Sequence, residues 1–166
     1  TVTRFWNNTN PEVQLADGNI FFEVDMSVLT ELGVFNPAVD SVQIRGGFNG
    51  WSDSDPSRAL MNQNAADENN FFIDIPFTQE ILNSTQFYKF YLKNGSGSTP
   101  YANTGWEVSI DPTTSGNRDR PIVFEGSPTQ EAGLKYFDGI HPDWVIPAGT
   151  TVECEFSVDM TYATLA

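Results

Sequence analysis

Two stretches of the sequence gather aromatic rings with polar side chains of the kind that bind sugars. The first is Gly46-Gly47-Phe48-Asn49-Gly50-Trp51, and the second is Tyr88-Lys89-Phe90, which is followed by Trp106 and Asn117. A sugar ring has a flat C–H face that packs on an aromatic ring, and a rim of hydroxyls that needs amide and ammonium partners. The candidate sugar-binding residues are therefore Trp51, Lys89, Trp106 and Asn117.

Each of these residues also has a purely structural interpretation. Trp51 follows a predicted strand and could close one end of the fold, and Lys89 could be an ordinary exposed strand lysine. Asn117 could serve only to form the turn before Pro121. Trp106 is the hardest of the four to explain as a core residue, because it stands in a polar loop.

The sequence lacks the residue patterns that catalysis or metal binding would require. Glycoside hydrolysis needs two carboxylates at a fixed separation, and no acidic pair stands out from the general excess. His141 has no nucleophile near it in the sequence. Asp53 and Asp55 match part of a calcium loop but lack the glycine and the distal glutamate of an EF-hand. We expect a protein that is not an enzyme and needs no cofactor, with calcium as the alternative.

The charge balance narrows the choice of partners. Eight basic residues against 22 acidic ones leave a net charge of −14, and such a surface repels phosphate backbones and anionic lipids. Apolar stretches stay well below the 18 residues that a spanning helix needs. We therefore expect neither nucleic acid nor membrane insertion. A smaller expectation is a surface ion pair between Glu107 and Arg118.

The elements that must position these residues are short strands separated by turns. In the first of them, Phe22, Val24 and Met26 alternate on one face. One short helical turn is expected over 27–33, with Ser27 as its cap and Gly33 as its end. Such a pattern is typical of an all-β sandwich. The predicted strands are Ile20 to Met26, Ser41 to Arg45, Asn70 to Pro76, Gln86 to Lys93, Pro121 to Glu125 and Thr151 to Asp159.

A strand motif occurs twice and indicates a tandem array. Phe22-Glu23-Val24-Asp25-Met26-Ser27 returns as Phe156-Ser157-Val158-Asp159-Met160-Thr161. The segments before the two copies also match, since Arg4-Phe5-Trp6-Asn7 corresponds to Lys135-Tyr136-Phe137-Asp138. The alternative is that the two copies are similar edge strands of one sandwich.

The repeat predicts the division of the chain. Residues 1–16 are expected to be the tail of a preceding unit, and residues 17–150 to be one module. Residues 151–166 would be the first strand of a following unit or a strand donated to a neighbouring subunit. Cys154 shares the parity of Phe156, so we expect it to be buried as a small hydrophobic residue.

These motifs resemble the starch- and glycogen-binding modules of carbohydrate-binding module families 48 and 20. The resemblance covers roughly residues 20–125 and includes Gly47-Phe48-Asn49-Gly50-Trp51, Tyr88-Lys89-Phe90, Trp106-Glu107 and Asn117-Arg118, in that order. It implies an immunoglobulin-like β-sandwich with short strands and long loops. It also implies an α-glucan ligand, with glucose rings stacked on Trp51 and Trp106 and hydroxyls bonded by Lys89 and Asn117.

The motif F-x-V-D-M-S is also similar to the start of repeated modules in large secreted bacterial surface proteins. That likeness implies an extracellular or cell-surface location, with a polysaccharide or neighbouring copies of the same module as partner. Two functions therefore remain open at this stage. One is a non-catalytic carbohydrate-binding module, and the other is a structural repeat that builds a fibre, sheath or stalk by strand addition without a sugar ligand.

Overall fold

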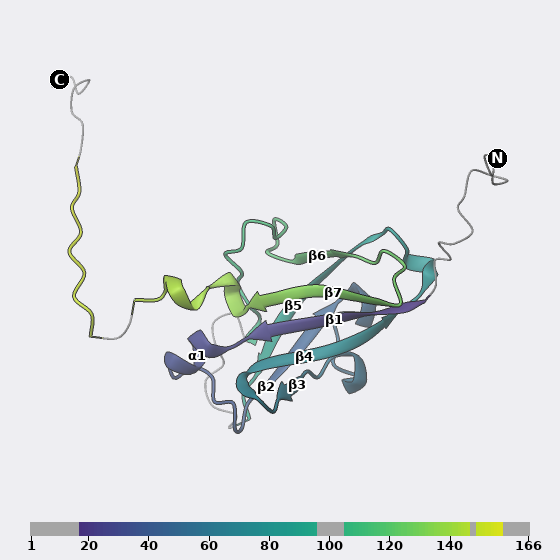
Figure 1. Ribbon diagram of the computed structural model, residues 1–166, viewed down its shortest axis with the longest axis horizontal. Coiled ribbons are helices and arrows are strands. Elements are labelled where there is room, and N and C mark those ends of the chain that lie inside the picture. Colours follow the sequence, from purple (N-terminus) through teal and green to yellow (C-terminus); the bar gives the residue numbers. More distant parts are fainter. Residues whose placement is uncertain (1–16, 96–104, 147–148, 158–166) are drawn as a thin grey trace, which may run out of the picture.

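The chain folds into an all-β sandwich of two sheets, which confirms the fold class expected from the sequence (Figure 1). The structure is a computed structural model and describes residues 17–95, 105–146 and 149–157. The elements are β1 (Gly18–Asp25), α1 (Ser27–Glu31), β2 (Ser41–Gly46), β3 (Asn62–Asn64), β4 (Asp67–Phe77), β5 (Thr85–Lys93), β6 (Arg120–Val123) and β7 (Thr129–Tyr136). Short 3₁₀ turns lie at Gly47–Asn49, Pro56–Arg58, Gln79–Ile81, Phe137–Gly139 and Pro142–Trp144.

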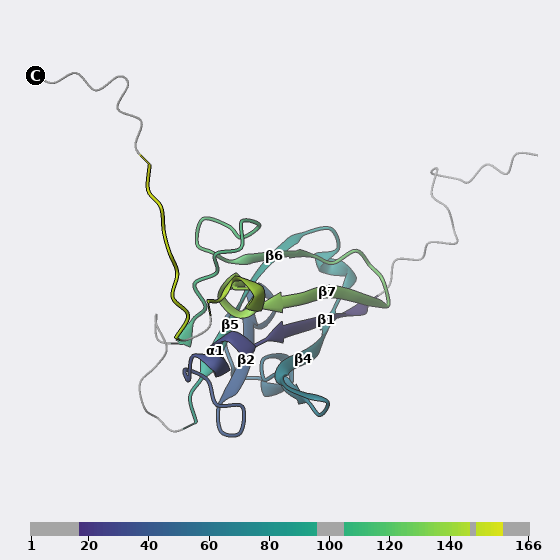
Figure 2. The same cartoon turned by 60° about the vertical axis from the view of Figure 1, so that its left-hand side comes forward.

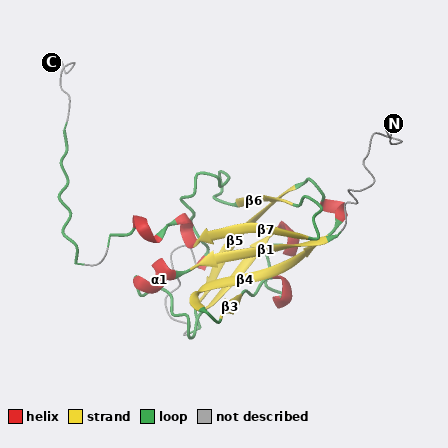
Figure 3. Ribbon diagram, viewed as in Figure 1, coloured by secondary structure: helices red, strands yellow, loops and turns green. Residues whose placement is uncertain are grey.

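Strands β3-β4-β1-β7 form one sheet, called sheet A here, and β2-β5-β6 form the other, called sheet B. All pairs are antiparallel except β1 and β7, which run in the same direction. The N-terminal end of β1 and the C-terminal end of β7 consequently lie at opposite ends of the sandwich (Figures 1 and 2). Helical turns lie only at the ends and edges of the sheets (Figure 3).

The core lies between the sheets and follows the predicted alternation. Ile20, Phe22, Val24 and Met26 are completely buried, and Phe22 meets the ring of Tyr88 from sheet B edge-on, with 5.0 Å between centroids. Burial of these apolar side chains supplies the main stabilisation of the sandwich. The other buried strand residues are Val42, Ile44, Phe71, Ile73, Ile75, Phe77, Phe90 and Leu92.

The short helix forms where it was expected, but a different residue caps it. The backbone N–H of Ser27 donates to the side chain of Asp25 at 2.7 Å, and the Ser27 hydroxyl is buried without a hydrogen-bond partner. The N-cap position is Met26, which makes no side-chain capping bond, and Asp25 satisfies the N–H of Ser27 itself. Gly33 follows the helix with φ +68°, a conformation that suits glycine.

Two strands were not predicted from the sequence. β3 consists of three polar residues, so it has no apolar alternation. β7 pairs with β1 in parallel, and the register of this pair shifts between Phe21 and Glu23. On the β7 side the interruption lies close to Gly133, which has φ +73°. A strand that depends on a distant partner and contains such an irregularity leaves little local signal.

The described part of the predicted C-terminal strand is not part of this sandwich. The described residues 149–157 form no strand, and both Cys154 and Phe156 are exposed. The prediction of a buried Cys154 is therefore wrong for this chain, and so is a strand over the described part of 151–159. β1 already has β4 and β7 on its two sides, so a further strand cannot pair with β1 in this sandwich. Residues 1–16 and 158–166 lie outside the described residues, so the predicted array and its boundaries remain predictions.

Asp138 is a buried acidic residue in the turn after β7. It has φ +59°, and its carboxylate accepts a hydrogen bond from the Val108 N–H at 2.6 Å. Burial raises the pKa of Asp138, and the Val108 N–H only partly counteracts this effect. The folded state therefore has to keep a poorly solvated charge at neutral pH.

We expect the substitution Asp138→Asn to stabilise the protein at pH 7. Asparagine keeps an acceptor for Val108, tolerates positive φ and removes the cost of the buried charge. A rise in Tm of about 2–4 °C corresponds to roughly 1 kcal/mol in a chain of this size. Because the folded pKa is raised, the gain must shrink as the pH falls and vanish below about pH 3.9, where Asp138 is protonated in both states. Thermal unfolding of parent and variant across pH measures this, and a lower Tm or a pH-independent gain would contradict it.

Candidate functional site

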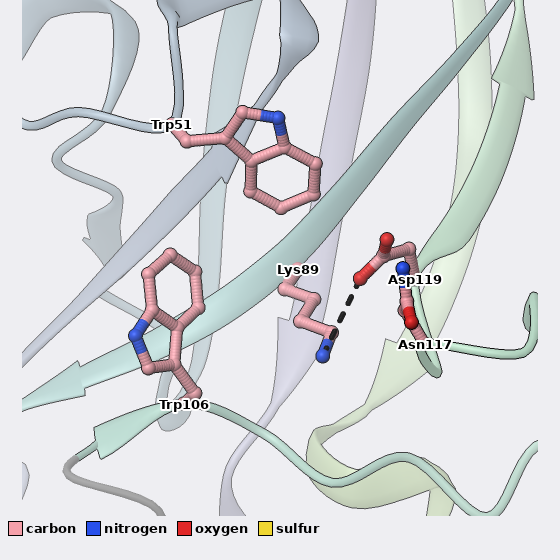
Figure 4. A pocket seen from close by; sticks show the side chains of 5 residues that line it. All are labelled: Trp51, Lys89, Trp106, Asn117 and Asp119. Carbon is pink, nitrogen blue, oxygen red and sulfur yellow. Dashed lines mark ion pairs between the residues drawn. The ribbon is translucent and has the colours of Figure 1, made fainter.

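The outer face of sheet B carries a cavity of about 340 Å³ where the predicted residues meet. The two indole rings lie on one side, Asn117 and Asp119 on the other, and Lys89 between them (Figure 4). All four predicted side chains, Trp51, Lys89, Trp106 and Asn117, therefore line one space. Their role in binding remains a prediction. Asp119 is the one lining residue that the sequence reasoning missed.

Lys89 points into the cavity because of the alternation along β5. Its neighbours Tyr88 and Phe90 are buried in the core, so Lys89 must project from the opposite face of the sheet. Its side chain is only 14% exposed, and its Nζ lies 3.3 Å from the Asp119 carboxylate. It therefore differs from the ordinary exposed strand lysine that was the alternative interpretation.

The turn after β2 presents Trp51 to the cavity. The Asn49 side chain accepts a hydrogen bond from the Gly46 N–H and donates to the carbonyls of Ile44 and Arg58, at 2.9 to 3.0 Å. These bonds close the turn and bring Gly50 and Trp51 into left-handed conformations, with φ +64° and +59°. Such a backbone costs a tryptophan roughly 1–2 kcal/mol.

Phe48, and not Trp51, closes the end of the sandwich. The Phe48 ring packs against the core rings of Phe22 and Phe77, with 5.6 and 5.4 Å between centroids. Trp51 is 37% exposed, and its ring lies beside that of Trp106, with 6.2 Å between centroids. A strained and exposed aromatic residue at the mouth of a cavity is a candidate for ligand contact.

Trp106 is held against the edge of β5. It forms a β-bridge with Tyr91 and meets the Tyr91 ring edge-on, with 5.1 Å between centroids. The Arg45 guanidinium lies 3.9 Å from the centre of the Tyr91 ring and 5.4 Å from that of Trp106. These contacts fix the orientation of the Trp106 ring although the residue follows a loop. Residues 96–104 of that loop lie outside the described part of the chain.

Glu107 takes part in a buried ion pair, although a surface pair with Arg118 was predicted. The Glu107 side chain is completely buried and accepts hydrogen bonds from Arg120 Nε and Nη2 and from the Phe90 N–H, at 2.8 to 3.2 Å. Arg118 instead donates to the Ser109 carbonyl at 2.8 Å. The prediction was wrong because the start of β6 brings Arg120, two residues after Arg118, to the Glu107 carboxylate.

Burial and pairing have opposite effects on the pKa values of the two residues in this ion pair. Burial raises the pKa of Glu107, while the hydrogen bonds and positive charge of Arg120 counteract that rise. Burial is the largest influence on Arg120 and works against its charged form, but hydrogen bonding to Glu107 and the nearby negative charges together outweigh burial and raise the pKa of Arg120. Arg120 Nη2 further donates to the Tyr136 carbonyl at 2.9 Å, which connects the pair to the end of β7.

The basic side chains around the cavity are matched by carboxylates. Besides the Lys89–Asp119 pair, Asp53 lies 3.0 Å from Arg45 and 3.8 Å from Lys93. The charge of Arg45 holds the pKa of Asp53 below its ordinary value. The face therefore offers hydrogen-bond donors and acceptors without a net positive field. Asp119 could have been suspected from its position two residues after Asn117, but nothing local showed its pairing with Lys89.

Neither aspartate of the partial calcium pattern is arranged for calcium. The Asp53 carboxylate faces two basic side chains, and Asp55 caps a 3₁₀ turn by accepting from the Ser57 N–H and hydroxyl. Within the described ranges, no group of three or more His, Cys, Asp or Glu residues is placed to hold a metal ion.

The α-helix of the described residues, α1, has five residues. None of the described helices is long and apolar enough to cross a membrane.

Comparison with known proteins yields likenesses of structure only. No protein-family model and no curated protein sequence matches this chain. Similar solved structures include a γ-CGTase from alkalophilic Bacillus clarkii, with 17% identity and a TM-score of 0.45 over 73% of this chain and 15% of that one. A glycoside hydrolase family 15 glucoamylase from Hypocrea jecorina has 13% identity and a TM-score of 0.46 over 74% and 17%. The chain spans less than a fifth of either protein, so their activities are not assigned to it.

We expect substitution of either partner of the buried ion pair to be strongly destabilising. Glu107→Gln leaves the buried Arg120 charge with only its longer contact to the Asp111 carboxylate, at 3.4 Å, and breaking a buried pair typically costs about 3–5 kcal/mol. Replacing both residues, in Glu107→Gln/Arg120→Met, removes the unpaired charge and should recover part of this loss. Urea unfolding of the parent, both single variants and the double variant measures the coupling. If the loss in free energy of unfolding of the double variant equalled the sum of the two single losses, the pair would not be coupled.

Proposed function

We propose that this chain is a non-catalytic module that binds a neutral polysaccharide, with an α-glucan as the preferred ligand. The observation that carries the proposal is the meeting of Trp51, Trp106, Lys89 and Asn117 around one open cavity. Aromatic rings offer a surface for the C–H face of a sugar, and the lysine and asparagine side chains offer partners for its hydroxyls. Asp119 adds an acceptor for a hydroxyl donor.

The geometry of the two rings favours a curved chain over a flat one. The planes of Trp51 and Trp106 are inclined by 55°, with 6.2 Å between the ring centres. Sugar units that stack on both rings must turn relative to one another, as successive units of a helical α-glucan do. A straight ribbon such as cellulose would need two rings that lie close to one plane.

The electrostatics favour a neutral ligand over an anionic one. Lys89 and Arg45 each have a carboxylate partner within 3.3 Å, and the whole chain carries a net charge of −14. A uronate or sulfate group entering the cavity would meet Asp119 and would find no uncompensated cation among the residues that line it.

We expect the parent protein to be retained on insoluble starch and the two tryptophan variants to be released. Trp106→Ala and Trp51→Asn each remove one ring, and each should weaken binding by about tenfold or more. Asparagine is chosen at position 51 because it tolerates the left-handed backbone. Trp144→Ala is the matched control, since Trp144 is 66% exposed and lies outside this cavity. Binding isotherms on starch and glycogen provide the measurement.

Several outcomes of this experiment would contradict the proposal. If the parent were not retained on starch or glycogen, an α-glucan would be excluded as the ligand. Equal retention on cellulose or on a polyuronate would contradict the arguments from ring tilt and charge. If Trp51→Asn lowered Tm as much as a core truncation does, Trp51 would be a structural residue. Release of reducing ends from starch would show that the module is catalytic.

We further propose that the module belongs to a tandem-repeat protein outside the cell or on its surface. The repeated strand motif supports this, and so does the parallel pairing of β1 with β7. Because the chain enters at one end of the sandwich and leaves at the other, successive modules would follow one another end to end. Polysaccharide and neighbouring modules would then be the natural partners.

A structural repeat without a sugar ligand is the second candidate function. The exposed apolar side chains of the segment after residue 149 favour it, above all Phe156, which is 89% exposed. A strand of this kind can add to the free edge of another sheet. In that case we expect the parent to self-associate with rising concentration and Phe156→Ser to remain monomeric. Sedimentation velocity distinguishes the two, and a monomeric parent at all concentrations would exclude assembly through this segment.

A further inference from the structure

A second cavity opens on the same face of sheet B and is not used by the proposed site. Its volume is about 290 Å³, and it lies beside the exposed ends of β2 and β5. Four of its six lining residues are polar or charged, and two are apolar. They are Ser41, Gln43, Asp53, Pro56, Leu60 and Lys93.

The strand geometry places the two cavities on one continuous face. Along β5, Lys89, Tyr91 and Lys93 alternate with buried residues and therefore project to the same side. Lys89 lines the first cavity and Lys93 the second. Four residues of extended strand separate them by about 13 Å. In the register with β2, Tyr91 is opposite Gln43, which lines the second cavity.

A surface of packed side chains connects the two cavities. Trp106 touches Tyr91, and the Arg45 guanidinium covers the Tyr91 ring at 3.9 Å. The Arg45 guanidinium is fixed by Gln43 Oε1 at 2.6 Å and by Asp53 at 3.0 Å. A ligand that leaves the first cavity over Trp106 thus continues across Tyr91 and Arg45 to the second cavity without crossing a barrier of unpaired charge.

The lining of the second cavity is chemically suited to a sugar unit without an aromatic ring. Pro56 and Leu60 present C–H groups that can pack against a sugar face. The Ser41 hydroxyl, the Asp53 carboxylate and the Lys93 ammonium offer both acceptors and donors to hydroxyl groups. The half-exposed Lys93 and Asp53 side chains lie 3.8 Å apart, a separation at which a sugar hydroxyl can bridge them.

We infer that this second cavity is a further sugar subsite, so that the module binds an internal stretch of a polysaccharide chain that lies across β5 and β2. The inference rests on the proposed function and makes it more specific. The ligand is then several sugar units long, and short oligosaccharides fill only the first cavity, beside the two tryptophans. The contribution of Leu60 and Lys93 to binding depends on ligand length, whereas that of Trp106 does not.

The test compares maltotriose with maltoheptaose by isothermal titration calorimetry on the full chain. The Leu60→Ala/Lys93→Ala variant removes the apolar wall and the ammonium of the second cavity. Both side chains are exposed at the surface, so folding should be unaffected. The Leu134→Ala/Lys135→Ala variant on β7 is the matched control, because it removes the same two residue types from sheet A.

We expect the parent to bind maltoheptaose about tenfold more tightly than maltotriose. The Leu60→Ala/Lys93→Ala variant should lose about fivefold in affinity for maltoheptaose and keep its affinity for maltotriose within about twofold. Longer chains also bind in more registers, but that statistical gain is the same in parent and variant. The control variant should match the parent with both ligands.

Two results would overturn the inference while leaving the proposed function intact. One is equal affinity of the parent for both oligosaccharides, and the other is a loss in the variant that is the same for both. If the parent bound neither oligosaccharide, nor starch, the proposed function itself would be wrong, and the subsite with it.

Discussion

The buried ion pair between Glu107 and Arg120 holds together the segments that form the outer face of sheet B. Two charges removed from water are costly unless their hydrogen-bonding capacity is met. Here the carboxylate accepts from Arg120 and from the Phe90 N–H, and the guanidinium also reaches the Tyr136 carbonyl. The pair therefore joins β5, the start of β6 and the end of β7. Because Trp106 precedes Glu107 directly and Asn117 lies three residues before Arg120, both sides of the cavity depend on it.

Neighbouring residues of the turn after β2 have different structural roles. Phe48 packs against the core, Asn49 closes the turn with hydrogen bonds to Ile44 and Arg58, and Trp51 is left at the surface in a strained conformation. The strain is tolerated because the hydrogen bonds and the burial around it overdetermine the turn. A rigid aromatic surface results, supplemented by Arg45 over Tyr91. Side chains that are ordered before a ligand arrives lose less entropy on binding.

The strands that a local pattern marks were predictable, and those that a distant partner defines were not. The alternation in β1 and β5 reveals which side chains are buried, because each residue of a strand points opposite to the next. β3 has no apolar residue, and β7 exists through its parallel pairing with β1. The described residues 149–157 likewise form no strand and leave Cys154 exposed, although the alternation predicted a strand there. An alternating sequence favours an extended strand, and the neighbouring strands available to it decide whether it pairs.

By itself the sequence determined the sandwich, its buried faces and four side chains with the chemistry to contact a sugar. Those four could be named because aromatic and amide groups after strand ends stand out against an alternating pattern. The tertiary structure decided that they share one cavity, that Asp119 faces Lys89, and that Arg120 instead of Arg118 pairs with Glu107. It also aligned Arg45 and Tyr91 beside a second cavity. These features depend on which strands pair and which loops meet, and the alternation along one strand shows its buried face but not its partner in the fold.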